Sequence, residues 1–204
     1  MKVNLLYHSP IWLSMLAARK CTDTQGESSN EKDIALLESI IGRDHTSVIE
    51  HVNYTFDIPE LSRACLQEMA RHRIASPSVQ STRFTLKKLI GRATTIDDLR
   101  AILRSSGNEK IDTLNLVHLN TLRQIMIREG LKNDVAKYAL PEAFKTTMIW
   151  TINARSLRNF LKLRLAKGVL AEIRELAGAV CAEIPLDHRV LFPEIFLRSK
   201  GKES

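Results

Sequence analysis

One stretch of the sequence alternates strictly between apolar and polar residues: Val52-Asn53-Tyr54-Thr55-Phe56-Asp57-Ile58. Successive side chains of a β-strand point to opposite faces of a sheet, so this pattern predicts a strand with one buried face. Lys145 to Ile152 is rich in Thr, Met, Ile and Trp and predicts a second strand. Val79 to Phe84, which follows the break at Pro77, is also expected to be extended.

The segments around these strands carry helix signals. Ser29 or Asn30 is expected to cap a helix that runs to about Ile41, and Pro59 to open one from Glu60 to about Arg71. The other expected helices are a short one capped at Thr95, a long one from about Lys110 to Arg128 that ends at Gly130, and two that cover Ala154 to about Leu165 and Ala166 to Ile184. Strands and helices do not alternate as in βαβ units. The sequence therefore predicts an α+β fold, a single domain over residues 1–204 with helices packed around a small, mainly antiparallel sheet.

The composition is that of a soluble globular protein, with 44% hydrophobic and 26% charged residues among 204. No apolar run reaches the roughly 18 residues that span a bilayer, and the N-terminus lacks a signal-peptide pattern, so we expect a cytoplasmic protein with no membrane partner. The aromatic residues expected in the core are Trp12, Trp150 and Phe160. Cys21, Cys65 and Cys181 are too far apart for a C-x-x-C pair and are expected to be buried structural thiols.

Positive charge is concentrated in two stretches that contain no acidic residue. Residues 71–92 hold six Lys or Arg and residues 151–168 hold five, in a chain of formal net charge +7. Such stretches favour a polyanionic partner, either nucleic acid or nucleotide phosphates. A solvated basic face would give the same composition.

The first of these stretches begins with an unusual run: Arg71-His72-Arg73-Ile74-Ala75-Ser76-Pro77-Ser78-Val79-Gln80-Ser81-Thr82-Arg83. If its end is extended, Ser81 and Arg83 project from the same face of the strand. A hydroxyl beside a guanidinium suits a phosphate group, because arginine can bind two phosphate oxygens at once. The run therefore predicts an anion site, with a solvated basic loop as the alternative.

The same run resembles the motif of the flavin-dependent thymidylate synthases, Arg-His-Arg followed by seven residues and Ser, extended here to Ser81-Thr82-Arg83. Upstream, His45-Thr46-Ser47-Val48-Ile49-Glu50-His51 resembles the family's H-x-T-x-x-E-H, with Ser47 at the Thr position. Downstream, the segment from Asn153 to Arg164 resembles its N-A-R-S-L-x-N-F-L-x-L-R. The resemblance spans roughly residues 10 to 197.

The resemblance implies an FAD enzyme that converts dUMP to dTMP, with methylenetetrahydrofolate as one-carbon donor and NADPH as reductant. It implies a homotetramer, and it implies roles for individual residues. The flavin contacts that it implies are His45, Ser47, Glu50, Arg71, His72, Arg73, Asn153, Arg155 and Asn159. The dUMP contacts are Ser81 and Arg83 at the phosphate, Lys137 near it, Glu68 and Gln80, and Arg164, the catalytic residue that grips and polarises the uracil ring.

Some positions depart from the family pattern. Val79 stands where an acidic residue normally contacts dUMP, and Gln80 or backbone is expected to replace that contact. Glu68 replaces a glutamine, which keeps an acceptor but loses the amide donors. Lys137 replaces an arginine and keeps the charge without the bidentate geometry. These changes bear on the strength of dUMP binding.

Helical spacing adds one expectation about the downstream segment. Arg155 and Asn159 are four residues apart and share a helix face, whereas Arg164 lies five beyond Asn159 and points elsewhere. Arg164 is therefore expected to reach a different part of the site, which suits a substrate contact.

Other chemistries lack their sequence patterns. No H-E-x-x-H motif is present, and no metal site is expected. Neither a G-x-G-x-x-G nor a P-loop motif is present, so side chains and helix ends are expected to hold the flavin. The alternative function is a basic nucleic-acid-binding module without enzymatic activity. The two basic stretches of this chain lack the interleaved aromatic residues on which single-strand binders stack bases. No nucleic-acid partner is therefore expected.

Overall fold

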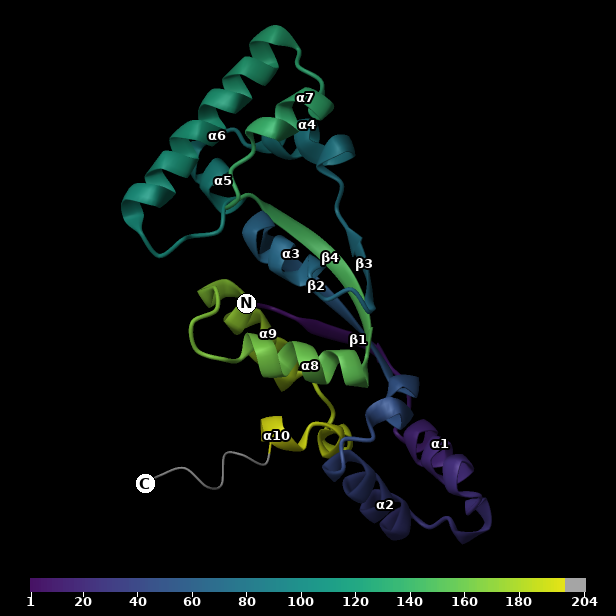
Figure 1. The fold of residues 1–204 in the computed structure, drawn as a ribbon. Helices are drawn as coiled ribbons and strands as arrows, with labels where there is room; N and C mark the ends of the chain where they lie inside the picture. Colours follow the sequence, from purple (N-terminus) through teal and green to yellow (C-terminus); the bar gives the residue numbers. More distant parts are fainter. Residues whose placement is uncertain (197–204) are drawn as a thin grey trace, which may run out of the picture. The chain divides into compact units, whose positions relative to one another are not determined.

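The computed structural model describes residues 1–196, apart from the side chains of Glu27 and Asn30. It contains helices and one four-stranded sheet (Figure 1). The strands are β1 (Asn4–His8), β2 (Asn53–Ser62), β3 (Ala75–Val79) and β4 (Lys145–Asn153), in the order β1-β2-β4-β3. β1 and β2 pair antiparallel, with a register shift between Leu5 and Tyr7. The expected α+β class with a small sheet is confirmed.

The α-helices are α1 (Trp12–Thr22), α2 (Asn30–Gly42), α3 (Arg63–Ala70), α4 (Thr82–Arg92), α5 (Ile96–Ala101), α6 (Glu109–Glu129), α7 (Asn133–Ala136), α8 (Ala154–Arg164), α9 (Ala171–Ala182) and α10 (Pro193–Phe196). Four 3₁₀ helices join them: η1 (Gln25–Glu27), η2 (Thr46–His51), η3 (Lys137–Ala139) and η4 (Leu186–Leu191). Among the described residues, no helix combines the length and apolarity needed to cross a bilayer.

The chain forms two compact units. Unit 1 comprises Met1–Ile58, His72–Pro77 and the described residues from Ile149 onward, and unit 2 comprises Pro59–Arg71 and Ser78–Met148. The expectation of a single domain stays a prediction, and residues 197–204, which it included, lie outside the described part of the chain.

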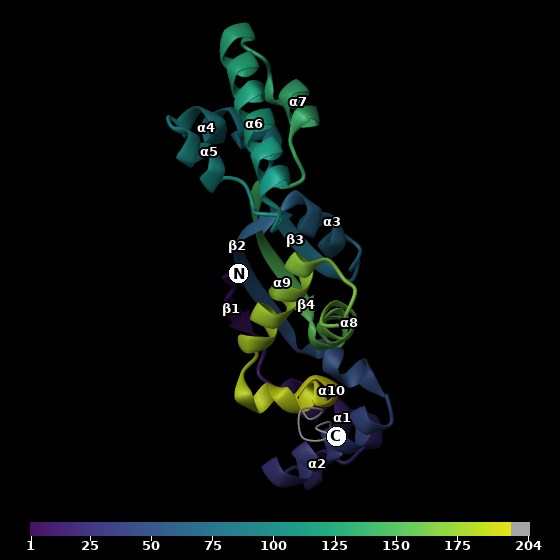
Figure 2. The same ribbon diagram turned by 90° about the vertical axis from the view of Figure 1, so that its left-hand side faces the viewer.

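Unit 1 is built on an aromatic core. Trp150 packs against Phe56 and Phe160, with ring centroids 6.1 Å and 5.0 Å away, and all three side chains are buried. Helices α8 and α9 lie side by side in both views (Figures 1 and 2). Trp150 and Phe160 are in the core as expected. The same expectation for Trp12 is wrong, because α1 buries Ser14, Met15, Ala18 and Arg19 while Trp12 is 55% exposed.

Helices α1 and α2 of unit 1 are joined by a buried ion pair. Arg19 Nε lies 2.8 Å from Asp33 Oδ1, and both side chains are less than a tenth exposed. The hydroxyl of Ser28 hydrogen-bonds the other carboxylate oxygen and, together with Arg19, holds the pKa of Asp33 below its usual range. Asp33 is therefore charged in the folded protein, which offsets the cost of burying the arginine.

Unit 2 is built on the long helix α6. Its buried residues Leu116, Leu119, Leu122 and Met126 keep helical spacing and pack in one cluster with residues of α4 and α5. The Asn108 side chain caps the start of α6, and Gly130 ends it with φ of 63°, a conformation that glycine adopts without strain. The expected long helix and its end at Gly130 are confirmed, as are α2 capped by Ser29 and α5 capped by Thr95.

The structure corrects two boundaries near Pro59 and Val79. β2 continues through Pro59 to Ser62, so the helix begins at Arg63 and not at Glu60. β1 pairs with β2 only as far as Asp57, so the missing N–H of Pro59 interrupts no hydrogen bond on that side. The expectation that residues 79–84 are extended is wrong from Thr82 onward, because Thr82, Leu86 and Ile90 form a buried helical stripe and α4 starts at Thr82, whereas Ser81 keeps an extended backbone.

Candidate active site

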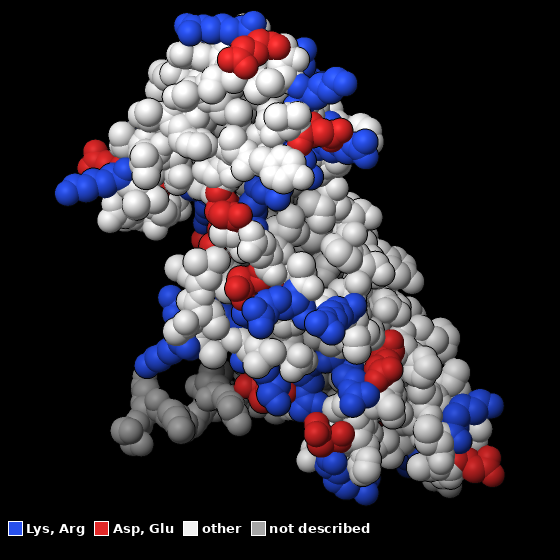
Figure 3. Space-filling view, turned by 45° about the horizontal axis from the view of Figure 1, so that its top comes forward, with Lys and Arg blue, Asp and Glu red and all other residues white. Residues whose placement is uncertain are grey.

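Several cations of the two acid-free stretches pair with acids that are distant in the sequence. Arg83 pairs with Asp134, Arg155 with Glu50, and Arg158 with Glu194. On the face drawn in Figure 3, acidic side chains lie among the Lys and Arg side chains. The described surface on that face is therefore mixed in charge, which favours discrete anion sites over a continuous track for a polynucleotide.

Helix α8 carries three of the expected flavin contacts at its start. Asn153 ends β4 and caps α8, where its side-chain oxygen accepts a hydrogen bond from the Ser156 N–H at 2.9 Å. Arg155 and Asn159 follow one turn apart, and both are exposed. Their shared face was expected from the spacing, and the cap explains why it begins at this point.

Arg155 brings α8 together with η2, the segment that holds the upstream motif. Its Nη1 atom lies 2.5 Å from Oε1 of Glu50, and both side chains are about half exposed. These residues are 105 positions apart in the sequence. Unit 1 therefore brings two of the expected flavin segments into direct contact.

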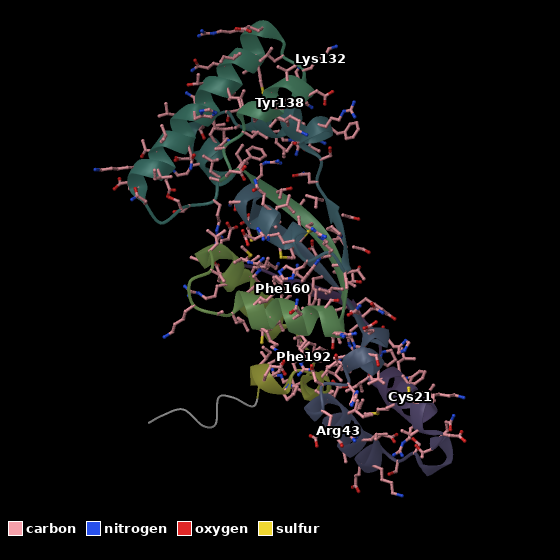
Figure 4. All side chains as sticks on the ribbon, viewed as in Figure 1. Cys21, Arg43, Lys132, Tyr138, Phe160 and Phe192 are labelled. Carbon is pink, nitrogen blue, oxygen red and sulfur yellow. The ribbon has the colours of Figure 1, made fainter. Side chains whose placement is uncertain are left out.

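A cavity of about 520 Å³ lies between α1 and η2 in unit 1, and its walls are mainly apolar. Its lining residues are Leu13, Leu16, Ala17, Lys20, Cys21, Ser47, Val48 and His51. Figure 4 labels Cys21 on α1. Apolar walls with a few polar groups suit a flat aromatic ligand, and Lys20 adds a cation. Among the expected flavin residues, the cavity includes Ser47, while His45 lies exposed just before η2.

His72 and Arg164 also meet in unit 1. Arg164 Nε donates a hydrogen bond to His72 Nε2 at 2.9 Å, and the His72 ring packs edge-on against Phe160, with ring centroids 4.9 Å apart. The resemblance assigned His72 to the flavin and Arg164 to the substrate. The contact joins a residue of each expected group.

In unit 2, Ser81 and Arg83 lie at the N-terminus of α4 instead of on a strand. Ser81 is the N-cap residue, and its side chain makes no capping hydrogen bond. Ser81 keeps an extended backbone but Arg83 lies in the first turn of α4, so the expected clamp, which needs both residues on one strand, is wrong in its geometry. A helix N-terminus nevertheless favours anions, because its first N–H groups point outward and carry partial positive charge.

Arg83 is held by the segment that begins α7. Its Nε lies 3.0 Å from Oδ1 of Asp134, and Asn133 donates from Nδ2 to the Arg83 carbonyl at 2.8 Å. Asn133 also accepts from the Lys87 N–H at 3.0 Å. A cavity of about 400 Å³ lies beside these residues and is lined by Arg83, Lys87 and Lys132 among others.

The expected site residues divide between the two units. Unit 1 contains His45, Ser47, Glu50, His72, Arg73, Asn153, Arg155, Asn159 and Arg164, and unit 2 contains Glu68, Arg71, Gln80, Ser81, Arg83 and Lys137. Glu68 and Gln80 are half-buried, and the Gln80 N–H donates to the Thr147 carbonyl at 3.0 Å. Arg71, Arg73 and Lys137 are exposed. With the exceptions of Arg71 and Arg164, the residues expected to contact the flavin belong to unit 1 and those expected to contact dUMP belong to unit 2.

The structure adds residues that the sequence analysis did not select. Lys20 and His51 line the cavity with Ser47, and Asn133 and Asp134 hold Arg83. Cys21 faces the same cavity and is exposed, so the expectation that all three cysteines are buried is wrong for Cys21; Cys65 is buried and Cys181 is partly buried. Glu50 and His51 both belong to the 3₁₀ helix η2. No local pattern marks Asp134, because its partner is distant in the sequence.

Comparisons with known proteins agree with one another. A family model described as "Thymidylate synthase complementing protein" matches residues 5–185. The chain is 43% identical over 199 residues to the flavin-dependent thymidylate synthase of Campylobacter jejuni, covering 94% of this chain and 96% of that protein. It is 37% identical over 205 residues to the enzyme of Helicobacter pylori, covering 95% and 98%. A crystal structure of the H. pylori thymidylate synthase X with FAD and dUMP matches with a TM-score of 0.89 at 36% identity, covering 95% of this chain and 98% of that one.

Proposed function

The chain belongs to the thymidylate synthase complementing protein family, and from this premise we propose that it is a flavin-dependent thymidylate synthase. It is an FAD-dependent methyltransferase that converts dUMP to dTMP. The family resemblance drawn from the Arg71–Arg83 run is confirmed by the family match, by close relatives and by solved structures.

The structural observation that carries the proposal is the contact between Glu50 and Arg155. It joins the segment His45–His51 to the segment that starts at Asn153, the two motif segments expected to hold the flavin. Neither residue is needed in the aromatic core, since both are about half exposed. An exposed ion pair contributes little to stability, so its relevance here is that it holds the two motif segments side by side on the surface of unit 1.

The residues of unit 1 fit FAD in chemistry. The cavity of about 520 Å³ offers apolar walls for an aromatic ring system, and Lys20 and Arg155 offer positive charge for a pyrophosphate. Asn159 and Ser47 offer hydrogen bonds to ring or sugar atoms. FAD, when bound, supplies the hydride chemistry that no side chain can supply. The protein's own contribution is to bind, to orient and to exclude water.

For dUMP, we assign the phosphate to Ser81, Arg83 and the N-terminus of α4. Three features support this: an N-cap hydroxyl not used for capping, an exposed guanidinium, and a helix end that favours negative charge. Lys137 adds a cation, and Glu68 and Gln80 are proposed as contacts of the base. Arg164 is proposed to hold the uracil ring, where a fixed cation stabilises negative charge that develops on the pyrimidine oxygens.

The balance of the reaction requires two classes of co-substrate, and the family resemblance implies which compounds they are. A methylene unit must gain two electrons to become the methyl group of dTMP, so the reaction needs a reductant as well as a one-carbon donor. We propose methylenetetrahydrofolate as donor and NADPH as the reductant that regenerates reduced flavin. A homotetramer and a cytoplasmic location remain predictions from the sequence.

The proposal is tested with the purified protein. We expect it to be yellow, to release FAD on denaturation, and to release tritium from dUMP labelled at the pyrimidine C5 only when NADPH and methylenetetrahydrofolate are present. Arg164→Ala should abolish tritium release, whereas Arg174→Ala, a substitution on α9 away from the expected contacts, should not. A colourless protein that binds polynucleotides in a salt-sensitive way would support the nucleic-acid-binding alternative instead.

A further inference from the structure

The hydrogen bond between Arg164 and His72 links two residues that are 92 positions apart. His72 lies in the loop between α3 and β3, and Arg164 is the last residue of α8. Both side chains are partly buried, and the Nε to Nε2 distance is 2.9 Å. The contact is internal to unit 1.

The bond requires an acceptor nitrogen on His72. An arginine guanidinium is always protonated, so its Nε can only donate. His72 Nε2 must then be the nitrogen without a proton, and the neutral ring carries its proton on Nδ1. A doubly protonated His72 would offer no acceptor and would repel the guanidinium.

The core of unit 1 holds the His72 ring in place. Phe160 and Arg164 are one turn apart on α8, so they share the face against which His72 lies. The His72 and Phe160 rings meet edge to face at an interplanar angle of 81°, and Phe160, labelled in Figure 4, is fully buried against Trp150. The position of the acceptor nitrogen therefore depends on aromatic packing rather than on a flexible surface chain.

The hydrogen bond from Arg164 Nε to His72 Nε2 restricts the orientation of the guanidinium plane. Arginine has a long side chain with many rotamers, and a site that binds a planar ring needs one of them. We propose that His72 is a positioning residue that holds the Arg164 guanidinium in the orientation in which it contacts the pyrimidine of dUMP. This inference rests on the proposed function, and it adds to the flavin contact that the family resemblance implies for His72.

Two substitutions separate the acceptor from the ring. His72→Phe keeps a ring against Phe160 but has no acceptor, and His72→Gln supplies a carbonyl acceptor without the ring. We expect His72→Phe to lower kcat/KM for dUMP at least ten-fold per bound FAD, and His72→Gln to recover a large part of the loss. Calorimetry with FAD-loaded protein should show the same order for dUMP affinity. His118→Gln is the matched control and should equal wild type, because it removes an exposed imidazole of unit 2 and leaves an amide that can still donate to the Ala139 carbonyl, which His118 Nε2 contacts at 2.7 Å.

The outcomes that overturn the inference are distinct from failure of the proposed function. Wild type that binds FAD but releases no tritium from dUMP overturns the function, and the inference falls with it. If wild type is active and His72→Phe is equally active, the inference alone is overturned. An equal loss of activity in His72→Phe and His72→Gln also overturns it, because the acceptor would then make no difference to activity. NMR of protein labelled with ¹⁵N-histidine, with His72 assigned from the Gln variant, needs no activity. A protonated Nε2 on His72 in wild type would also overturn it.

Discussion

Arg83 Nε lies 3.0 Å from Oδ1 of Asp134, so the residue expected to bind the dUMP phosphate is already paired with a carboxylate of the protein. The Arg83 and Asp134 side chains are 63% and 55% exposed, so water screens the pair. Asn133 holds the backbone of Arg83 by a separate hydrogen bond. The guanidinium is thus placed at the start of α4, and Asp134 competes with an incoming phosphate for it.

Arg83→Ala should weaken dUMP binding at least ten-fold while FAD stays bound. A charge-assisted hydrogen bond contributes about 1.5–3 kcal/mol, which is about ten- to a hundred-fold in affinity. Titration of dUMP against flavin fluorescence measures the effect. Lys88→Ala, which removes an exposed cation from the same helix, is the control for loss of charge alone. Unchanged dUMP affinity in the Arg83 variant would remove the phosphate assignment.

Asp134→Asn should tighten dUMP binding, by up to about five-fold, because the exposed pair is worth about 0–1 kcal/mol. The gain should shrink as salt is added, since salt screens charges that face water. The same fluorescence titration at low and high salt measures it. Weaker binding would mean that Asp134 orients Arg83 rather than competing for it.

Asn159→Ala and His45→Ala should purify with little or no FAD and still give the circular dichroism of wild type. Both side chains are exposed and lie outside the core, so their loss should not cost packing. The ratio of flavin to protein absorbance measures occupancy. Lys162→Ala is a matched exposed substitution on α8 and should keep its FAD. Full occupancy in both test variants would show that the flavin lies elsewhere.

The triple variant Cys21→Ser, Cys65→Ala, Cys181→Ala should release tritium from labelled dUMP within about ten-fold of wild type, since hydride delivery to an unattached pyrimidine needs no protein nucleophile. Cys65 is buried, and burial raises the pKa of the Cys181 thiol, with Arg189 offsetting part of that effect. Only Cys21 is exposed, so it decides the test. Abolition of tritium release by Cys21→Ser alone, with FAD bound, would contradict flavin-based hydride transfer.

Folding stability should fall as the pH drops below about 6.5, because of His188. Burial, and to a smaller extent His8, lowers the pKa of His188, while Asp187 opposes them. Below about pH 6.5, His188 binds a proton more readily in the unfolded chain than in the folded one, so acid favours unfolding. Tyr54, whose pKa burial raises, keeps its hydroxyl proton and hydrogen-bonds His188 Nδ1 at 2.8 Å. Urea midpoints between pH 5 and 8 should show a steeper loss in wild type than in His188→Gln; equal slopes would exclude this histidine as the cause.

Local pattern in the sequence was enough for much of the fold. The alternation from Val52 to Ile58 predicted β2, and a long helical segment that ends at Gly130 predicted α6, because side-chain periodicity and helix-ending glycines are properties of neighbouring residues. Strand β1 and helix α1 were not predicted. β1 is short and leaves Leu6 and Tyr7 exposed, so its pattern of burial does not alternate.

The sequence by itself determined the family and predicted which residues form the site. The run from Arg71 to Arg83 is long and unusual enough to indicate the family. Only the tertiary structure decided which of these residues meet. Arg164 reaches His72, Arg155 reaches Glu50, and Arg83 reaches Asp134. Each pair joins segments far apart in the chain, and a sequence pattern extends only over a few turns, so packing had to bring them together. The same limit explains the error from Thr82 to Phe84, where the burial of Leu86 and Ile90 against α6 favoured a helix over the extended form.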